Sequence, residues 1–217
     1  MYEMIPAVFL QCWTRTITQA MRDGDRLAWP SAFTYVHLAR NVVAQMFMQQ
    51  TDCDSLLFID SDMTWEPGDV DRLRDNEANW EYDVVSALCT SKRWPPRPIV
   101  PRRLEVDDLT LEVYGGTRYQ DFLDFEVGEV VPTDGCGMAF TLIRRRVFEA
   151  MLHPAGPEWT NWFELPKRTL EDTFFCDWAI GLGFRCAVDT SVQVGHLGYN
   201  SMGWWSYELW QRVKHEA

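Results

Sequence analysis

The apolar run at residues 56–59 constrains the fold of this chain more than any other feature. Its four leucine, phenylalanine and isoleucine residues do not alternate with polar ones. Such a run is typical of a strand covered on both faces in a mainly parallel sheet. It stops at Asp60, and Pro67 suits the first position of a following helix. The sequence therefore predicts a loop at residues 60–65, at the carboxyl end of a buried strand.

Short apolar runs alternate with helical patterns along the chain, which indicates an α/β fold. Strands are expected at residues 7–10, 56–59, 83–88, 127–131, 138–143, 184–188 and 192–194, and helices at residues 17–22, 36–49, 67–73, 169–180 and from residue 145. In the second helix, Leu38, Val42 and Met46 have the spacing of a buried face, with Arg40 and Asn41 opposite. A length of 217 residues suits one domain, ending in an aromatic tail or lid at residues 197–217.

Composition favours an ordinary globular protein, with 47% hydrophobic and 24% charged residues. The amino terminus lacks the pattern of a signal peptide, and no apolar run is long enough to span a membrane, so a cytoplasmic location is expected. Six cysteines without short paired spacings predict free thiols. The net charge of −12 disfavours nucleic acid as a partner. Residues 92–103 are an exception, because five basic residues, Trp94 and four prolines there predict an extended surface loop.

Asp60 and Asp62 flank Ser61 directly after the buried run. Ligands of open α/β sheets bind outside the carboxyl ends of strands, and carboxylate oxygens suit Mg²⁺ or Mn²⁺. Such an ion could join the protein to a diphosphate and neutralise the charge of a departing nucleoside diphosphate. The spacing alone is also explained by a solvated turn, because Asp-x-Asp arises often by chance.

The segment at residues 57–63, Leu-Phe-Ile-Asp-Ser-Asp-Met, resembles the metal-site strand of GT-A glycosyltransferases, particularly those of family 2. Gly135 and Gly137 resemble the turn that borders donor sugar and acceptor in that family, and Glu171 and Asp172 resemble its acidic pair near the acceptor. The resemblance extends from about residue 6 to residue 196. It implies a Rossmann-like, mainly parallel GT-A sheet flanked by helices, and inverting transfer from a nucleoside-diphosphate sugar to an acceptor hydroxyl.

The resemblance also implies roles for single residues. Asp172 is the candidate general base, with Glu171 as the close alternative, because a carboxylate can accept the proton of an attacking hydroxyl. Both could instead cap a helix that starts near Thr169 and stops at Gly183. His196 is the candidate third metal ligand, and an imidazole favours Mn²⁺ over Mg²⁺.

Two arginines and a threonine are candidates for holding the nucleotide. Arg15, with Thr14 beside it, is expected in the loop after the first strand, and Arg40 on the second helix. A guanidinium can bond two diphosphate oxygens at once, although either arginine could be an ordinary exposed residue.

Other functions remain open. A nucleotidyltransferase would use a related scaffold, but residues 9–16 lack the glycines of its phosphate loop. A binding module without turnover could use the same carboxylates. The acceptor is also open: the 92–103 loop or the run Arg144, Arg145 and Arg146 could meet a hydroxylated DNA base. Trp204, Trp205 and Trp210 could form a carbohydrate platform or pack the tail against the sheet.

Overall fold

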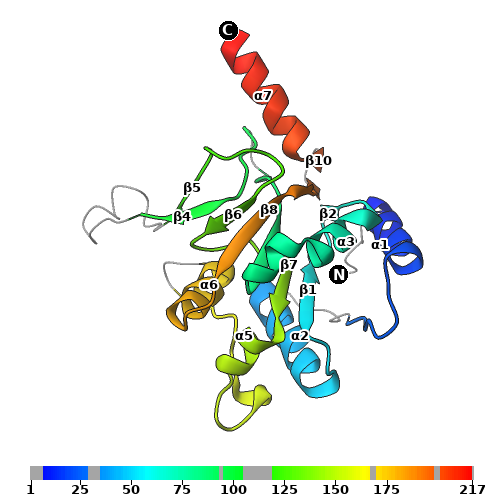
Figure 1. Ribbon diagram of the computed structural model, residues 1–217, viewed down its shortest axis with the longest axis vertical. Coiled ribbons are helices and arrows are strands. Elements are labelled where there is room, and N and C mark those ends of the chain that lie inside the picture. The colour runs from blue at the N-terminus through cyan, green and yellow to red at the C-terminus, as the bar shows by residue number, and fades with distance from the viewer. Residues whose placement is uncertain are drawn as a thin grey trace.

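A five-stranded sheet forms the centre of the protein in a computed structural model, which describes residues 7–28, 35–92, 95–104, 119–166, 170–197 and 201–216 (Figure 1). The strand order is β1 (Ser55–Ile59), β7 (Phe140–Arg144), β3 (Val84–Leu88), β8 (Cys186–Gln193) and β6 (Val130–Thr133). Only β3 and β8 run parallel, and the other three neighbouring pairs are antiparallel. The prediction of a mainly parallel, Rossmann-like GT-A sheet is therefore wrong.

The position of β1 explains this error. Leu57 and Ile59 pack into one hydrophobic cluster, whereas Leu56 and Phe58 pack into the cluster on the other face. Both faces are covered, as expected, yet β1 lies at the edge of the sheet and pairs only with β7 among the described strands. An apolar run without alternation reports two covered faces, and it does not report the direction of the neighbouring strands.

Two groups of helices cover the sheet. The helices α1 (Ala7–Gln19) and α3 (Pro67–Asp75) supply buried side chains to the first cluster. The second cluster receives side chains from α2 (Val36–Gln50), α5 (Arg145–Ala150) and α6 (Glu171–Gly181). The predicted strand at residues 7–10 is wrong, because these residues begin α1. Its buried residues Phe9, Cys12 and Thr16 recur at helical spacing, which a four-residue window does not reveal.

The buried face of α2 also differs from the prediction. Leu38 is 44% exposed, whereas Arg40 and Asn41 are buried together with Val43 and Phe47. A charged residue can occupy such a position when its charge is paired, as that of Arg40 is. Arg40 therefore faces the interior of the protein rather than solvent.

Smaller ladders surround the central sheet. The strand β2 (Met63–Thr64) pairs with β9 (Gly195–Leu197), which pairs with β10 (Ser201–Met202). The predicted surface loop at residues 92–103 is partly wrong, because β4 (Pro101–Arg103) pairs with β5 (Tyr119–Asp121) and several of its prolines are buried. Arg93, Trp94 and Thr169 lie outside the described residues.

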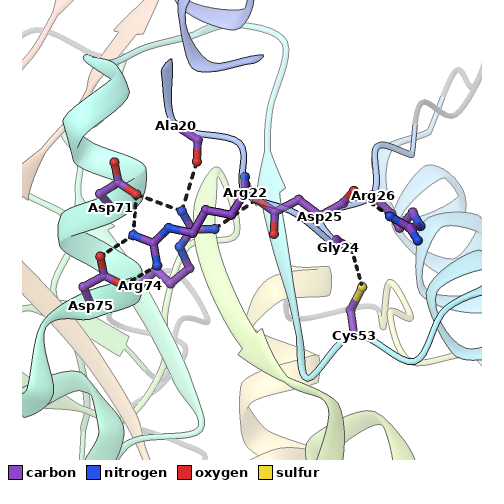
Figure 2. Close-up of polar contacts among 9 residues, drawn as sticks. All are labelled: Ala20, Arg22, Gly24, Asp25, Arg26, Cys53, Asp71, Arg74 and Asp75. Atoms are coloured by element: carbon purple, nitrogen blue, oxygen red, sulfur yellow. Dashed lines mark hydrogen bonds and ion pairs between the residues drawn. The ribbon is translucent and has the colours of Figure 1, made fainter. Parts of the chain in front are cut away.

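Charged side chains fasten the connection after α1 to α3 (Figure 2). Arg22 donates to Asp71 at 2.7 Å and to Asp75 at 2.8 Å. Arg74 donates to Asp25 and to the carbonyl of Ala20, both at 3.0 Å. These bonds hold residues 20–25, which follow α1, against α3.

The carboxyl-terminal helix α7 (Trp204–Glu216) extends away from the sheet (Figure 1). Tyr207 in its first turns is buried, whereas Trp205 is exposed. None of the described helices is both long and apolar enough to cross a lipid bilayer.

Candidate functional site

Asp60 and Asp62 lie in a tight connection between two ladders. The main-chain N–H of Asp60 donates to the carbonyl of Ala139 at 2.8 Å, which continues the pairing of β1 with β7. The carbonyl of Asp62 accepts from the N–H of Leu197 at 2.6 Å, so the turn is also tied to β9. Ser61 between them is exposed. Main-chain hydrogen bonds thus hold both ends of the acidic turn, so the backbone that carries the two carboxylates is fixed.

The β2–β9 ladder brings His196 to Asp62. Met63 is the register partner of His196, and the His196 Nε2 lies 3.5 Å from the Asp62 Oδ1. The other ring nitrogen, Nδ1, lies 3.1 Å from the carbonyl oxygen of Thr90. A carbonyl can only accept, so Nδ1 carries a hydrogen, and Nε2 is the ring nitrogen that faces Asp62. This is how a histidine is oriented when it ligates a metal.

The ammonium of Lys92 donates a hydrogen bond to the other carboxylate oxygen of Asp62, Oδ2. Burial raises the pKa of Asp62, but the hydrogen bonds and charges of His196 and Lys92 outweigh it and lower the pKa to about 2. Asp62 is therefore ionised at neutral pH.

Arg40 joins the two acidic motifs. Its Nη2 lies 3.0 Å and 3.2 Å from the two carboxylate oxygens of Asp60, and its Nη1 lies 2.5 Å from the Oε1 of Glu171. The Arg40 side chain is only 7% exposed. Because one guanidinium bonds both carboxylates, residues that are far apart in the sequence meet in one place.

Asp172 lies beside Glu171 in the first turn of α6, and its Oδ1 accepts a hydrogen bond from the N–H of Thr173 at 2.7 Å. Burial raises its pKa to about 6, although Arg40 opposes the shift and Glu171 adds to it. Burial raises the pKa of the Cys89 thiol, just after β3, to about 12, and the charges of Asp60 and Asp172 add to this shift. Asp172 therefore shares the surroundings of Asp60, and its carboxylate accepts protons more readily than an ordinary aspartate.

Thr14 and Arg15 lie elsewhere than expected. They belong to α1 rather than to a loop after a strand, and both line a separate groove beside α7. Arg15 forms an exposed ion pair with Glu66 at 2.6 Å. The structure therefore gives these two residues no described contact with the carboxylates of the acidic turn.

Gly135 and Gly137 lie between β6 and β7, but neither has a positive φ. A Cβ added at Gly135 would lie 3.7 Å from the Cβ of Cys176, which is an ordinary contact. The backbone here therefore does not require glycine at either position. Their contact with donor or acceptor stays a prediction.

A metal ion was expected at Asp60, Asp62 and His196. No group of three or more His, Cys, Asp or Glu side chains is close enough to hold one within the described parts of the chain. Arg40 engages Asp60 and Lys92 engages Asp62, so cationic side chains neutralise both carboxylates. The donor chemistry nevertheless fits, because the ionised Asp62 and the Nε2 of His196 already face each other.

Sequence reasoning missed Thr90, and it placed Lys92 only in the basic loop at residues 92–103. Thr90 orients His196, and Lys92 neutralises Asp62. Both follow β3, whose carboxyl end was predictable, but their partners lie on elements that only the tertiary structure brings near.

Comparisons with known proteins add little to this description. No protein-family model matches the chain, and no curated protein matches it significantly. Among solved structures, the chain is similar to one described as "Crystal Structure of A197 from STIV", with 20% sequence identity and a TM-score of 0.46. That likeness covers 76% of this chain and 69% of the other chain, and at this level it supports no conclusion about fold or function.

Proposed function

We propose that the protein is a metal-dependent glycosyltransferase that moves a sugar from a nucleoside diphosphate to an acceptor hydroxyl. The observation that carries this proposal is the bridge made by Arg40 between Asp60 and Glu171. This bridge brings the acidic turn after β1 and the acidic start of α6 into one site. Glycosyl transfer needs such a site, because the residues that bind the donor must lie near the general base. The mainly parallel sheet expected with this function is absent, so the proposal depends on the site.

Asp60, Asp62 and His196 are the residues that would hold Mn²⁺ or Mg²⁺. When bound, the ion would supply charge neutralisation for the diphosphate leaving group. In the structure, the ammonium of Lys92 neutralises the carboxylate of Asp62. This ion pair is partly exposed, so a metal ion can displace the ammonium. A histidine ligand favours Mn²⁺.

Asp172 is proposed as the general base. Its pKa of about 6 leaves it mostly ionised at pH 7 yet more basic than an ordinary aspartate. Its carboxylate takes the proton of the acceptor hydroxyl as the hydroxyl oxygen bonds to the anomeric carbon. The bond from that carbon to the diphosphate breaks at the same time, and the electron pair leaves with the diphosphate. A direct displacement of this kind inverts the anomeric centre. Glu171 is less suited to the role, because its carboxylate is engaged by Arg40.

A donor panel tests the proposal. Wild-type protein is incubated with Mn²⁺ and nucleoside-diphosphate sugars, and released nucleoside diphosphate is measured for it and for the variants Asp62→Asn, Asp172→Asn and Asp23→Asn. Asp23 is exposed and outside the site, so its variant is the control. Release that disappears in the first two variants supports the proposal. Pyrophosphate release would indicate a nucleotidyltransferase instead, and donor binding without release would indicate a binding module.

The location and the partners follow from the same proposal. All six cysteines are free thiols, which supports the cytoplasm as the compartment of this enzyme. Nucleic acid is the less favoured acceptor, because two arginines of the 92–103 segment have partners within the protein. Arg102 lies over the ring of Phe122 at 5.0 Å, and Arg103 forms an ion pair with Asp177.

A further inference from the structure

A groove of about 880 Å³ lies between α1, the β2–β9 ladder and the start of α7. Thr64 and Gly195, which line it, form the register pair next to Met63 and His196. The groove therefore begins one residue along the ladder from the proposed metal ligand His196. A volume within the range of about 300–1,000 Å³ is typical of sites for small organic ligands.

The groove combines an exposed aromatic ring with groups that form hydrogen bonds. Trp205 is 60% exposed, and Gln11, Gln193 and Glu208 on neighbouring elements are exposed as well. An indole offers a flat apolar face for the C–H groups of a sugar ring. Amide and carboxylate side chains offer the donors and acceptors that sugar hydroxyls need. This combination fits a saccharide better than an apolar ligand.

The position of Trp205 is fixed although its ring is exposed. A Cβ added at Gly203 would lie 3.3 Å from the Cδ1 and 3.4 Å from the Nε1 of Trp205, so the indole packs closely on this glycine. The same Cβ would lie 3.8 Å from the Cα of Gly195, which places the start of α7 directly against β9. Hydrogen bonds between Gly203 and Ser206 close this turn. The exposed ring is therefore presented by a defined backbone.

The neighbouring tryptophan has a different environment. The ring centroid of Trp204 lies 5.8 Å from that of Phe125 and 5.1 Å from that of Tyr207. It also packs against the small cluster that contains Leu88 and Val100. Trp204 thus anchors α7 to the protein, and Trp205 is left as the platform.

Charge on the groove disfavours an anionic ligand. Glu66, Asp69 and Glu208 contribute three carboxylates. Arg15 pairs with Glu66 and Arg72 pairs with Asp69, so the carboxylate of Glu208 leaves the groove with a net negative charge. A phosphate backbone would meet net repulsion here. A neutral sugar would not.

We propose that this groove binds the acceptor, a neutral oligosaccharide, with Trp205 stacking on one of its rings. The inference rests on the proposed glycosyltransferase function and names its acceptor class. Gln193 and Glu208 bond the hydroxyls of the stacked ring, and the end of the saccharide reaches the site along the β2–β9 ladder.

Saccharide binding and donor hydrolysis are measured separately to test it. Neutral gluco-, manno-, xylo- and chito-oligosaccharides are titrated into the wild type and into the variants Trp205→Ala, Gln193→Ala and Trp80→Ala, by calorimetry. Trp80 is the matched control, because it is 58% exposed and does not line this groove. Hydrolysis of the donor without acceptor is followed in the same proteins with Mn²⁺.

We expect at least one saccharide series to bind the wild type, about tenfold weaker binding in Trp205→Ala, and several-fold weaker binding in Gln193→Ala. That tenfold loss corresponds to about 1.4 kcal/mol. Trp80→Ala should bind as the wild type does, and all variants should keep donor hydrolysis. Donor hydrolysis with no saccharide binding, or with binding that Trp205→Ala leaves unchanged, would overturn the inference. Trp205-dependent binding without any donor turnover would overturn the proposed function and keep the groove as a saccharide site.

Discussion

Replacing Arg40 with methionine is expected to destabilise the protein more than any other change at the site. Methionine keeps most of the aliphatic volume but removes the guanidinium, which is 7% exposed and bonds both Asp60 and Glu171. Removing one partner of a buried ion pair costs about 3–5 kcal/mol, because the other charge stays buried. Asp60 is 31% exposed and can regain water, so the lower end, about 3 kcal/mol, is expected.

The loss should also depend on pH. Arg40 lowers the pKa of Asp172, so its removal raises that pKa above the present value of about 6. An acid whose pKa is higher in the folded than in the unfolded state stabilises the fold at low pH. That contribution is lost as the pH rises through the folded pKa. The deficit of Arg40→Met should therefore be larger at pH 8 than at pH 5, by about 1.4 kcal/mol for each unit of change in pKa.

Urea unfolding followed by tryptophan fluorescence at both pH values measures this deficit. Arg15→Met is the matched control, because the pair of Arg15 with Glu66 is 49% and 65% exposed and should contribute less than about 1 kcal/mol. The double variant Arg40→Met/Glu171→Gln should recover part of the loss, since it removes an uncompensated charge. A deficit below about 1 kcal/mol, equal to that of the control at both pH values, would refute the reasoning.

Three further predictions concern single residues. Asp172→Asn should abolish transfer yet raise stability at pH 7.5 by about 1–3 kcal/mol, with the gain vanishing toward pH 4, because the aspartate has a pKa of about 6. Urea unfolding across this pH range would contradict it if the wild type were the more stable protein at pH 7.5. Lys92→Met should tighten Mn²⁺ binding several-fold in calorimetric titrations, because the ion no longer competes with the ammonium at Asp62; weaker binding would mean that Lys92 assists the metal. Gly183→Ala should cost about 1 kcal/mol in thermal unfolding because its φ is +90°, whereas Gly181→Ala at the last residue of α6 should stabilise by up to about 0.5 kcal/mol; equal effects would contradict the conformational argument.

Local patterns in the sequence predicted several elements well. The strand β3, the helix α3 with its proline start, and α5 from Arg145 lie close to the expected residues. The helix α6 ends just before Gly183, whose positive φ fits the predicted stop. These features depend on spacing, capping and backbone conformation within one segment, which a sequence displays directly.

Strand direction and edge position depend on the whole chain. The apolar residues of β1 would be the same in a parallel or an antiparallel sheet, because hydrophobic burial has no direction along the strand. Antiparallel pairing with β7 was therefore not readable from residues 56–59. The residues at 7–10 could be placed only with the helical contacts that follow them in α1.

The candidate site was also predictable only where it depends on local patterns in the sequence. Asp60 and Asp62 were predicted from their position after a strand, and His196 from the family resemblance, and the β2–β9 ladder does bring His196 to Asp62. Arg40 was predicted as a site residue on a solvent-facing side of α2, and it is buried instead. Its burial depends on the carboxylates of Asp60, directly after β1, and of Glu171 in α6. The hydrophobic periodicity of α2 does not show that these carboxylates lie close to it.

Binding of Mn²⁺, measured by electron paramagnetic resonance with nucleoside diphosphate present, tests the central claim most directly. The account predicts a bound Mn²⁺ signal in the wild type and in Asp172→Asn. It predicts a loss of at least tenfold in affinity in Asp62→Asn and in His196→Ala, because these side chains face each other at 3.5 Å. Unchanged Mn²⁺ affinity in both of these variants, or no bound Mn²⁺ in the wild type, would contradict the account.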